Sequence, residues 1–267
     1  MKAILVCDDK KDLNEKLTEK YLKPEEDKNY SEENLKIWTD AITELSEIED
    51  AFETNEKIEL QGKKILDVGT DCIKPLYLAL KYEPSKIIGI DESGFREFNF
   101  EIESRSKFLT DTKIRLYDCS LFDEVALDKI RKKEEIVGLF DFVLVSKTLH
   151  HLRTDKCIEE HECQEDEESC KYGFNTEYVF EKLLSLGKRV VVYEPIDDGE
   201  DADKIRGRGC NLTKNEWHQI FQYFLKNSKL RIKFVRPQIF DFSKATLART
   251  EQILREVDLI CFYVEKL

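Results

Sequence analysis

The stretch at residues 63–93, KKILDVGTDCIKPLYLALKYEPSKIIGIDES, decides the fold of this chain. Two apolar runs in it predict buried strands, and a tight loop and a helix lie between them. The second run ends in Asp91. A strand, a loop, a helix and a strand that ends in an acid is the usual opening of a nucleotide-type cofactor site. The loop has only one glycine, Gly69, and an acid follows at Asp71.

Strands and helices alternate from residue 62 onward. The runs that predict strands are KKILDVG, KIIGID, KIRLYD, FDFVLVSKT, RVVVYEP, KLRIKFVRP and DLICFYVEK. One of the helices between them, NTEYVFEKLLSLGK, is expected to begin at Asn175 or Thr176 and to stop at Gly187. The alternation predicts an α/β fold with a seven-stranded, mostly parallel sheet and helices on both faces. Ligands of such sheets bind at the carboxyl ends of the strands, so the residues that follow each strand are the functional candidates.

Two segments fall outside this alternation. Apolar residues such as Leu35 and Trp38 recur at three- and four-residue steps in the N-terminal part, which predicts an amphipathic helix. We interpret residues 1–58 as a mainly helical extension packed on a main domain at residues 59–267. Residues 153–174 form an acidic insertion without periodicity that holds three cysteines and a histidine.

The composition limits the classes of function. The 267 residues are 41% hydrophobic, enough for a sizeable core, and carry a net charge of −13. Because phosphate affinity comes mainly from Lys and Arg, this charge gives no strong signal for nucleic-acid binding. No apolar run approaches the roughly 20 residues that span a membrane, and the first run is too short for a secretory signal. We expect a cytoplasmic protein without membrane contact, and its eight cysteines favour free thiols or a metal site over a disulfide framework.

Two acids end neighbouring strands of the predicted sheet. Asp91 follows Gly69 by 22 residues, at the place where a carboxylate accepts hydrogen bonds from a pair of ribose hydroxyls. Asp118 ends the third strand, where an acid suits an adenine amino group. The alternative is that such acids bind nothing and are only solvated side chains at strand ends. Two acids and a glycine loop at one sheet edge favour the cofactor interpretation.

Five stretches give the chain a family resemblance: ILDVGTD, IIGIDES, LYDCS, FDFVLVSKTLHHL and RVVVYEP. Over about residues 60–200 the chain resembles class I S-adenosylmethionine-dependent methyltransferases, and the final strand pair also fits that fold. The most specific stretch is FDFVLVSKTLHHL, because many members have a strand beginning Phe-Asp that runs into Leu-His-His-Leu. The resemblance implies a Rossmann-like sheet and S-adenosyl-L-methionine as the cofactor.

The resemblance also implies roles for individual residues. Gly69 lets the backbone approach the methionine part of the cofactor, and Asp67 orients the loop. Asp91 binds the ribose. Residues from Ser146 onward line the methyl-transfer site. The complete implied cofactor site is Asp67, Gly69, Thr70, Asp71, Asp91, Asp118, Cys119 and Ser146.

The loop departs from the usual G-x-G-x-G pattern of the family, because the second and third glycines are replaced by Asp71 and Ile73. One interpretation is that the cofactor binds and Asp71 meets its positively charged amino group or sulfonium. A dinucleotide pyrophosphate would be repelled there, which counts against NAD. The other interpretation is a degenerate pocket. Some tRNA adenine methyltransferases carry a similar D-x-G-[S/T]-D loop followed by an apolar stretch and a proline, which favours the first interpretation.

Two histidines and one acid complete the candidates at this edge. His150 and His151 are the titratable pair near physiological pH, and we expect one of them to act as a base or to bind the acceptor. The alternative is that one packs in the core and the other caps a helix. Glu194, after the fifth strand, either faces the substrate pocket or closes the strand.

The acidic insertion holds four weak candidates for metal ligands, which are Cys157, His161, Cys163 and Cys170. Thiolates and an imidazole in one short segment match the ligand set of a structural zinc site. Their spacing is not that of a standard zinc knuckle, so free thiols are favoured over zinc or a disulfide.

These observations predict a methyltransferase that uses S-adenosyl-L-methionine. The acceptor is unidentified, and is either a small molecule or one position in a nucleotide or protein. The alternative is a non-catalytic methyltransferase-like protein that binds a cofactor or a partner.

Overall fold

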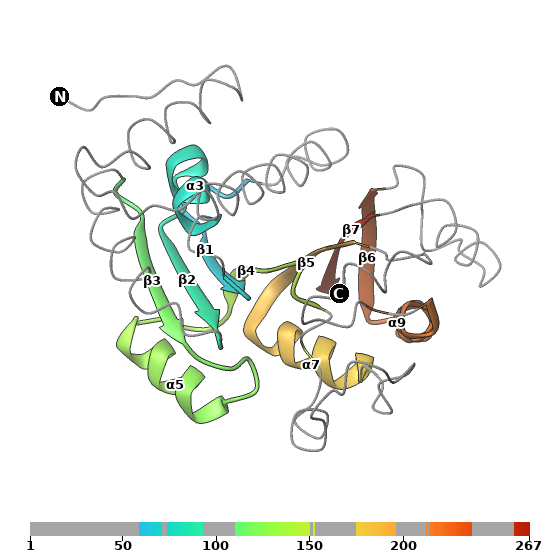
Figure 1. Cartoon of the computed structure of the whole chain (residues 1–267). Helices are drawn as coiled ribbons and strands as arrows, with labels where there is room; N and C mark the ends of the chain where they lie inside the picture. Colours follow the sequence, from blue (N-terminus) through green and yellow to red (C-terminus); the bar gives the residue numbers. More distant parts are fainter. Residues whose placement is uncertain are drawn as a thin grey trace, which may run out of the picture.

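The structure is a computed structural model that describes residues 59–70, 74–92, 110–149, 152, 175–195, 212, 214–236 and 259–267 (Figure 1). Its elements are β1 (Lys64–Val68), α3 (Lys74–Tyr82), β2 (Lys86–Asp91), β3 (Lys113–Asp118), α5 (Glu124–Lys133), β4 (Phe140–Ser146), α7 (Thr176–Leu186), β5 (Gly187–Pro195), α9 (Lys214–Lys226), β6 (Leu230–Arg236) and β7 (Leu259–Lys266). The extension at 1–58 and the insertion at 153–174 lie outside the described residues.

The seven strands form one sheet in the order β3-β2-β1-β4-β5-β7-β6. Strands β1 to β5 pair in parallel, and β7 runs antiparallel to both of its neighbours, β5 and β6. The predicted seven-stranded, mostly parallel, Rossmann-like sheet is therefore confirmed. Since β1 and β4 lie side by side in the middle, the loops that follow them meet at the centre of the carboxyl edge.

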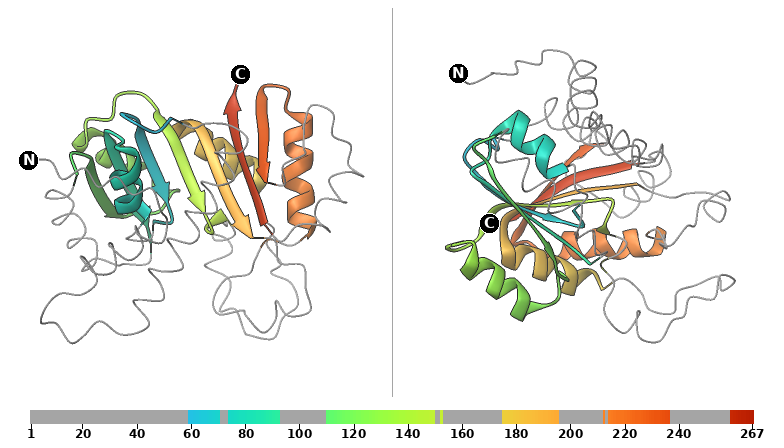
Figure 2. Two further views of the ribbon diagram at one scale, coloured as in Figure 1. Left: turned by 90° about the horizontal axis from the view of Figure 1, so that it is seen from above. Right: turned by 60° about the vertical axis from the view of Figure 1, so that its left-hand side comes forward.

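Helices cover both faces of the sheet. α3 lies on one face, and α5, α7 and α9 lie on the other (Figure 2). Strands β1 and β4 are almost continuously buried, as expected for parallel strands covered on both faces. Strand β3 alternates between buried and partly exposed residues, which suits its place at the edge of the sheet.

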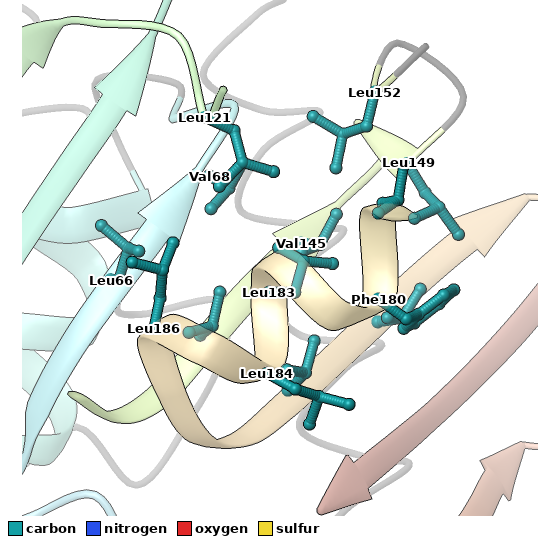
Figure 3. Packing of buried hydrophobic residues seen from close by; sticks show 14 of the residues in the cluster. Leu66, Val68, Leu121, Val145, Leu149, Leu152, Phe180, Leu183, Leu184 and Leu186 are labelled. Carbon is teal, nitrogen blue, oxygen red and sulfur yellow. The ribbon is translucent and has the colours of Figure 1, made fainter. Parts of the chain in front are cut away.

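The main core lies between the sheet and helices α5, α7 and α9. Leu66 and Val68 of β1 and Val145 of β4 belong to the same cluster as the apolar face of α7 (Figure 3). The Phe180 ring of α7 packs edge-on against Phe224 of α9, with centroids 4.9 Å apart. This packing fixes both helices relative to the strands whose carboxyl ends form the candidate site.

Helix α7 leads directly into β5 without a loop. Its N-cap is Asn175, whose side chain accepts a hydrogen bond from the Tyr178 N–H at 3.1 Å, as predicted. Gly187 ends the helix, but its backbone is extended and it is also the first residue of β5. The strand thus begins two residues before the predicted start at Arg189. A Cβ on Gly187 would lie 2.4 Å from Val143 Cγ2, so lack of space explains this glycine.

The amino edge of the sheet carries a buried acid, Glu134, that follows α5. Its carboxylate accepts a hydrogen bond from Tyr117 Oη at 2.7 Å and forms an ion pair with Lys113 Nζ at 2.7 Å. Lys86 and Arg115 lie 3.7 and 3.8 Å away. Burial acts to raise the pKa of Glu134, but the bonds from Lys113 and Tyr117 and the nearby positive charges outweigh it and lower the pKa.

Asp141 of β4 is the second acid at the amino edge. Its two carboxylate oxygens accept hydrogen bonds from Lys188 Nζ at 2.7 Å and from the Lys64 backbone N–H at 3.0 Å. Partial burial acts to raise the pKa of Asp141, but these two bonds outweigh it and hold the pKa below its ordinary value. Asp141 thus ties together the starts of β1, β4 and β5.

Candidate cofactor site

The carboxyl edge brings the ends of the first four strands together. Asp91 of β2 and Asp118 of β3 are direct partners in the strand register. Val68, the last residue of β1, pairs with Ile90 on one side and with Val145 on the other. The loop after β1 therefore begins between the acid of β2 and the exit of β4, as the sequence predicts for a cofactor loop.

The loop after β1 bends over the end of β2. The backbone N–H groups of Gly69 and Thr70 both donate to the Ile90 carbonyl oxygen, at 2.9 and 3.2 Å. Gly69 has φ +67°, a left-handed conformation that glycine adopts without strain. A Cβ on Gly69 would also lie 2.1 Å from Thr148 Oγ1, so the position has no room for a side chain.

Gly89, in the middle of β2, is a residue that the sequence analysis missed. A Cβ there would lie 2.8 Å from Thr70 Oγ1 and 2.5 Å from Leu116 Cδ2. Thr70 is buried, and the absence of a side chain at Gly89 makes room for it. A glycine inside a strand pattern often marks a close approach of another part of the chain, which is the signal that was available here.

Asp67 lies in β1 beside Gly89 of β2 and Leu144 of β4 in the register. Its side chain is fully buried. This burial suits the predicted role in orienting the loop, and places the carboxylate inside the fold instead of on the open edge.

Asp91 and Asp118 differ in exposure. Asp91 is half-buried, and Asp118 is exposed. The backbone N–H of Cys119 donates to the Asp91 carbonyl oxygen at 3.0 Å, which holds the ends of β2 and β3 together. These residues fit a cofactor that carries hydroxyl and amino donors, because ionised carboxylates only accept hydrogen bonds.

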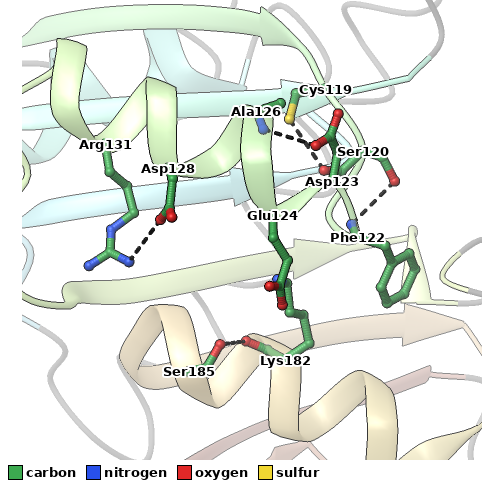
Figure 4. A network of polar contacts seen from close by, with 10 residues as sticks. All are labelled: Cys119, Ser120, Phe122, Asp123, Glu124, Ala126, Asp128, Arg131, Lys182 and Ser185. Carbon is green, nitrogen blue, oxygen red and sulfur yellow. Dashed lines mark hydrogen bonds and ion pairs between the residues drawn. The ribbon is translucent and has the colours of Figure 1, made fainter.

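The turn after β3 leads into helix α5, whose first turn is capped by a side chain (Figure 4). Asp123 is the N-cap of α5, and its Oδ1 accepts from the Ala126 N–H at 2.9 Å. The buried Cys119 thiol contacts the Ser120 carbonyl oxygen at 3.2 Å. Burial, together with the negative charges of Asp123, Glu92 and Asp118, raises the pKa of Cys119 to about 11. Cys119 therefore stays a thiol at neutral pH, and it contributes packing and a backbone hydrogen bond to this turn.

The exit of β4 forms the other side of the site. Ser146 is buried, and the next residue, Lys147, is exposed with φ +49°. The Lys147 N–H donates to the Tyr193 carbonyl oxygen at 2.8 Å, which keeps this turn attached to β5. A lysine in the left-handed region is unusual and makes the turn a strained one.

Glu194, near the end of β5, contacts the turn after β4. Its side chain is fully buried, and Oε2 accepts a hydrogen bond from the Leu149 N–H at 3.1 Å. Of the two interpretations left open by the sequence, the one in which Glu194 has a structural role at the strand end is favoured by this contact.

Lys74, the first residue of α3, is the second residue that the sequence analysis missed. Its side chain is 2% exposed. Its ammonium nitrogen lies 3.3 Å from the Gly69 carbonyl oxygen and 3.5 Å from that of Ser146. Lysines are rarely buried, so the sequence offered no signal that this one points into the fold.

Several predicted residues lie outside the described part of the chain. They are Asp71, the histidines His150 and His151, and the metal-ligand candidates Cys157, His161, Cys163 and Cys170. Within the described ranges, no group of three or more His, Cys, Asp or Glu side chains is arranged to hold a metal ion. In the same ranges, no helix is both long enough and apolar enough to cross a membrane.

No protein-family model and no curated protein matches this chain. Solved structures do resemble it. Geranyl diphosphate C-methyltransferase from Streptomyces coelicolor matches with a TM-score of 0.47 and 10% identity, over 89% of this chain and 86% of that one. Magnesium protoporphyrin IX methyltransferase from Synechocystis matches with a TM-score of 0.44 and 12% identity, over 97% and 100%. The YcgJ protein from Bacillus subtilis matches with a TM-score of 0.47 and 11% identity, over 83% and 98%.

All three TM-scores lie below 0.5, so these likenesses carry no conclusion about the activity of this chain. Identities this low carry no information about the acceptor.

Proposed function

We propose that this chain is an S-adenosylmethionine-dependent methyltransferase that acts on an acceptor still to be identified, a small molecule or one position in a nucleotide or protein. The bound cofactor supplies the electrophilic methyl group. The protein contributes a site that positions cofactor and acceptor for displacement at the methyl carbon.

One observation carries the proposal. The left-handed turn at Gly69 is hydrogen-bonded to the Ile90 carbonyl, directly beside the in-register pair of Asp91 and Asp118. A glycine backbone in the left-handed conformation thus lies next to two carboxylates, which supports the proposal. In the proposed site Asp91 accepts from the ribose hydroxyls, and Asp118 with the backbone at Cys119 holds the adenine.

Asp71 follows this turn, and we propose that it faces the positive charge of the methionine part of the cofactor. Replacing Asp71 with Ala should weaken S-adenosylmethionine binding more than it weakens folding. The acceptor base is proposed to be His150 or His151, which follow the strained turn at Lys147.

The test is a calorimetric titration with S-adenosylmethionine and S-adenosylhomocysteine. We expect the wild-type protein to bind both, and Asp91→Ala to weaken binding about tenfold or more, because a pair of hydrogen bonds to a charged group is lost. Asp128→Ala is the control, since Asp128 is an exposed acid in the middle of α5. If neither S-adenosylmethionine nor S-adenosylhomocysteine gives heat of binding, the proposal is ruled out.

Binding without methyl transfer to any acceptor class would instead support a non-catalytic methyltransferase-like protein. A screen with radiolabelled S-adenosylmethionine against small molecules, nucleic acids and peptides separates the two. Transfer of label to one class would identify that class as the acceptor.

A further inference from the structure

We propose that Lys74 and Thr148 are positioning residues that couple the cofactor loop to the acceptor side of the site. Both side chains contact the same two backbone carbonyl groups, those of Gly69 and Ser146. We call these four residues the carbonyl clamp. The inference rests on the proposed function, because it assigns the loop after β1 to the cofactor and the turn after β4 to the acceptor.

The contacts of the clamp cross between two strands. Lys74 Nζ lies 3.3 Å from Gly69 O and 3.5 Å from Ser146 O. Thr148 Oγ1 lies 2.9 Å from Ser146 O and 3.5 Å from Gly69 O. The hydroxyl has one hydrogen, which the two carbonyls share as acceptors with Ser146 the nearer, while the ammonium has three and donates to both. The two loops are thus held by shared groups and not by separate bonds.

The close fit at Gly69 adds a steric link to the polar one. A Cβ on Gly69 would lie within 2.6 Å of the Thr148 Oγ1, Cγ2 and Cβ atoms. The backbone of the cofactor loop therefore rests against the side chain that follows β4. A shift of either loop has to move the other.

Burial strengthens the attraction between the Lys74 ammonium and the carbonyl oxygens around it. Lys74 as a residue is 2% exposed, so its ammonium has little contact with water and is stable there only if polar groups replace that water. The carbonyls of Gly69 and Ser146 are such groups, and their attraction to a charge is stronger inside the fold than in water. Lys74 therefore binds both loops more firmly than a neutral side chain can.

The clamp also shows what holds the described start of this loop, at Gly69, in place. In the G-x-G-x-G pattern, glycines allow tight packing between the loop, the strand and the helix. In this chain α3 begins with Lys74, whose side chain reaches back to the loop and fixes the Gly69 carbonyl. Methyl transfer requires the two reactants to be aligned within a fraction of an ångström, so a fixed spacing between the two loops serves the reaction.

The first experiment compares Lys74→Met and Thr148→Val with Thr148→Ser and Lys81→Met. Thr148→Ser keeps the hydroxyl, and Lys81→Met makes the same substitution at the other end of α3, where the lysine is exposed. Binding of S-adenosylhomocysteine is measured by calorimetry. We expect Lys74→Met to weaken it about tenfold and Thr148→Val about threefold, and the two control variants to bind like wild type.

The second experiment measures amide hydrogen exchange in the ligand-free proteins. Lys74→Met should speed exchange at Lys147–Leu149 as well as at Gly69 and Thr70, although the first group lies more than 70 residues away in the sequence. A lysine that only stabilises α3 would change exchange in its own helix. The effects of Lys74→Met and Thr148→Val on binding should also be less than additive, because they remove contacts to shared carbonyls.

The outcomes are separable. Exchange that is unchanged at Lys147–Leu149 in Lys74→Met overturns the clamp, as do strictly additive effects. If Lys74→Met does not fold, the pair Thr148→Val and Thr148→Ser tests the same link, and equal exchange in the two variants overturns it. If the wild-type protein does not bind S-adenosylhomocysteine, the proposed function fails, while hydrogen exchange still decides whether the two loops are coupled.

Discussion

The two edges of the sheet use buried charges in different ways. At the amino edge, Glu134 contacts the charged or polar side chains of its neighbours, among them Lys113 and Tyr117. At the carboxyl edge, Lys74 and Glu194 contact main-chain groups in the loops that follow β1 and β4. The first arrangement joins secondary-structure elements. The second fixes the shape of loops.

The left-handed glycines at the two edges differ in the space around them, while both edges also have left-handed residues that are not glycine, Glu83 and Glu135 at the amino edge and Lys147 at the carboxyl edge. The amino edge has left-handed residues at Gly62 and Gly138, where a side chain would meet no atom within 4 Å. At the carboxyl edge Gly69 is left-handed and also pressed against Thr148. Among the left-handed glycines, Gly69 at the carboxyl edge therefore has the least space for a side chain, although Gly187 at the start of β5 also lies close to Val143.

The largest effect is expected from Gly69→Ala. It combines a left-handed alanine, which costs about 1–2 kcal/mol, with overpacking that costs about 1–3 kcal/mol. We expect a loss of about 3 kcal/mol in the free energy of unfolding, measured with urea, and loss of detectable S-adenosylhomocysteine binding in calorimetry.

The matched control for this variant is Gly62→Ala, which has the same backbone conformation without the clash. It should lose only about 1 kcal/mol and bind the ligand normally. Equal losses in the two variants would remove the proposed difference between the edges.

An intermediate effect is expected from Glu134→Gln at the amino edge. The variant leaves Lys113 and its neighbours without their anion, and we expect it to lose about 2 kcal/mol of stability at neutral pH. Its affinity for S-adenosylhomocysteine should equal that of wild type. Weaker binding would show that the two edges are not independent.

The pH dependence of this loss follows from the lowered pKa of Glu134. A carboxyl group whose pKa is lowered by folding stabilises the protein above its unfolded pKa of about 4.3. That stabilisation is lost as the pH falls through the lower, folded pKa. The difference in stability between wild type and Glu134→Gln should therefore shrink on acidification, and a constant difference would contradict the ion-pair account.

The smallest effect concerns the buried thiol at the carboxyl edge. With a pKa raised to about 11, Cys119 has little thiolate at pH 8. We expect iodoacetamide to modify Cys119 in the native protein far more slowly than in urea, as read by peptide mass spectrometry. Equal modification rates in the native protein and in urea would show that the Cys119 thiol is accessible to the reagent in the folded protein.

Much of the fold could be predicted from the sequence, because strand patterns are local. The runs KIIGID and KIRLYD match β2 and β3 in full. The pairing of Asp91 with Asp118 also follows, since parallel strands of similar length end at the same edge.

The contacts that shape the site could not be predicted. Lys74 and Thr148 meet at carbonyls that come from different loops, and no local pattern reports which loops are neighbours. The role of Gly89 depends on where Thr70 lies, and that of Glu194 on the turn at Leu149. Each is a contact between distant parts of the chain.

The strand order has a consequence for how the chain folds. β4 enters the sheet beside β1, where the Lys64 N–H bonds a residue 77 positions later, and β7 enters between β5 and β6. Such distant pairings give a high contact order, and loop closure must precede the stabilising contacts. A half-formed sheet therefore has unpaired β1 and β5 edges for as long as the later strands are missing, so folding is expected to be slow and most open to aggregation at that stage.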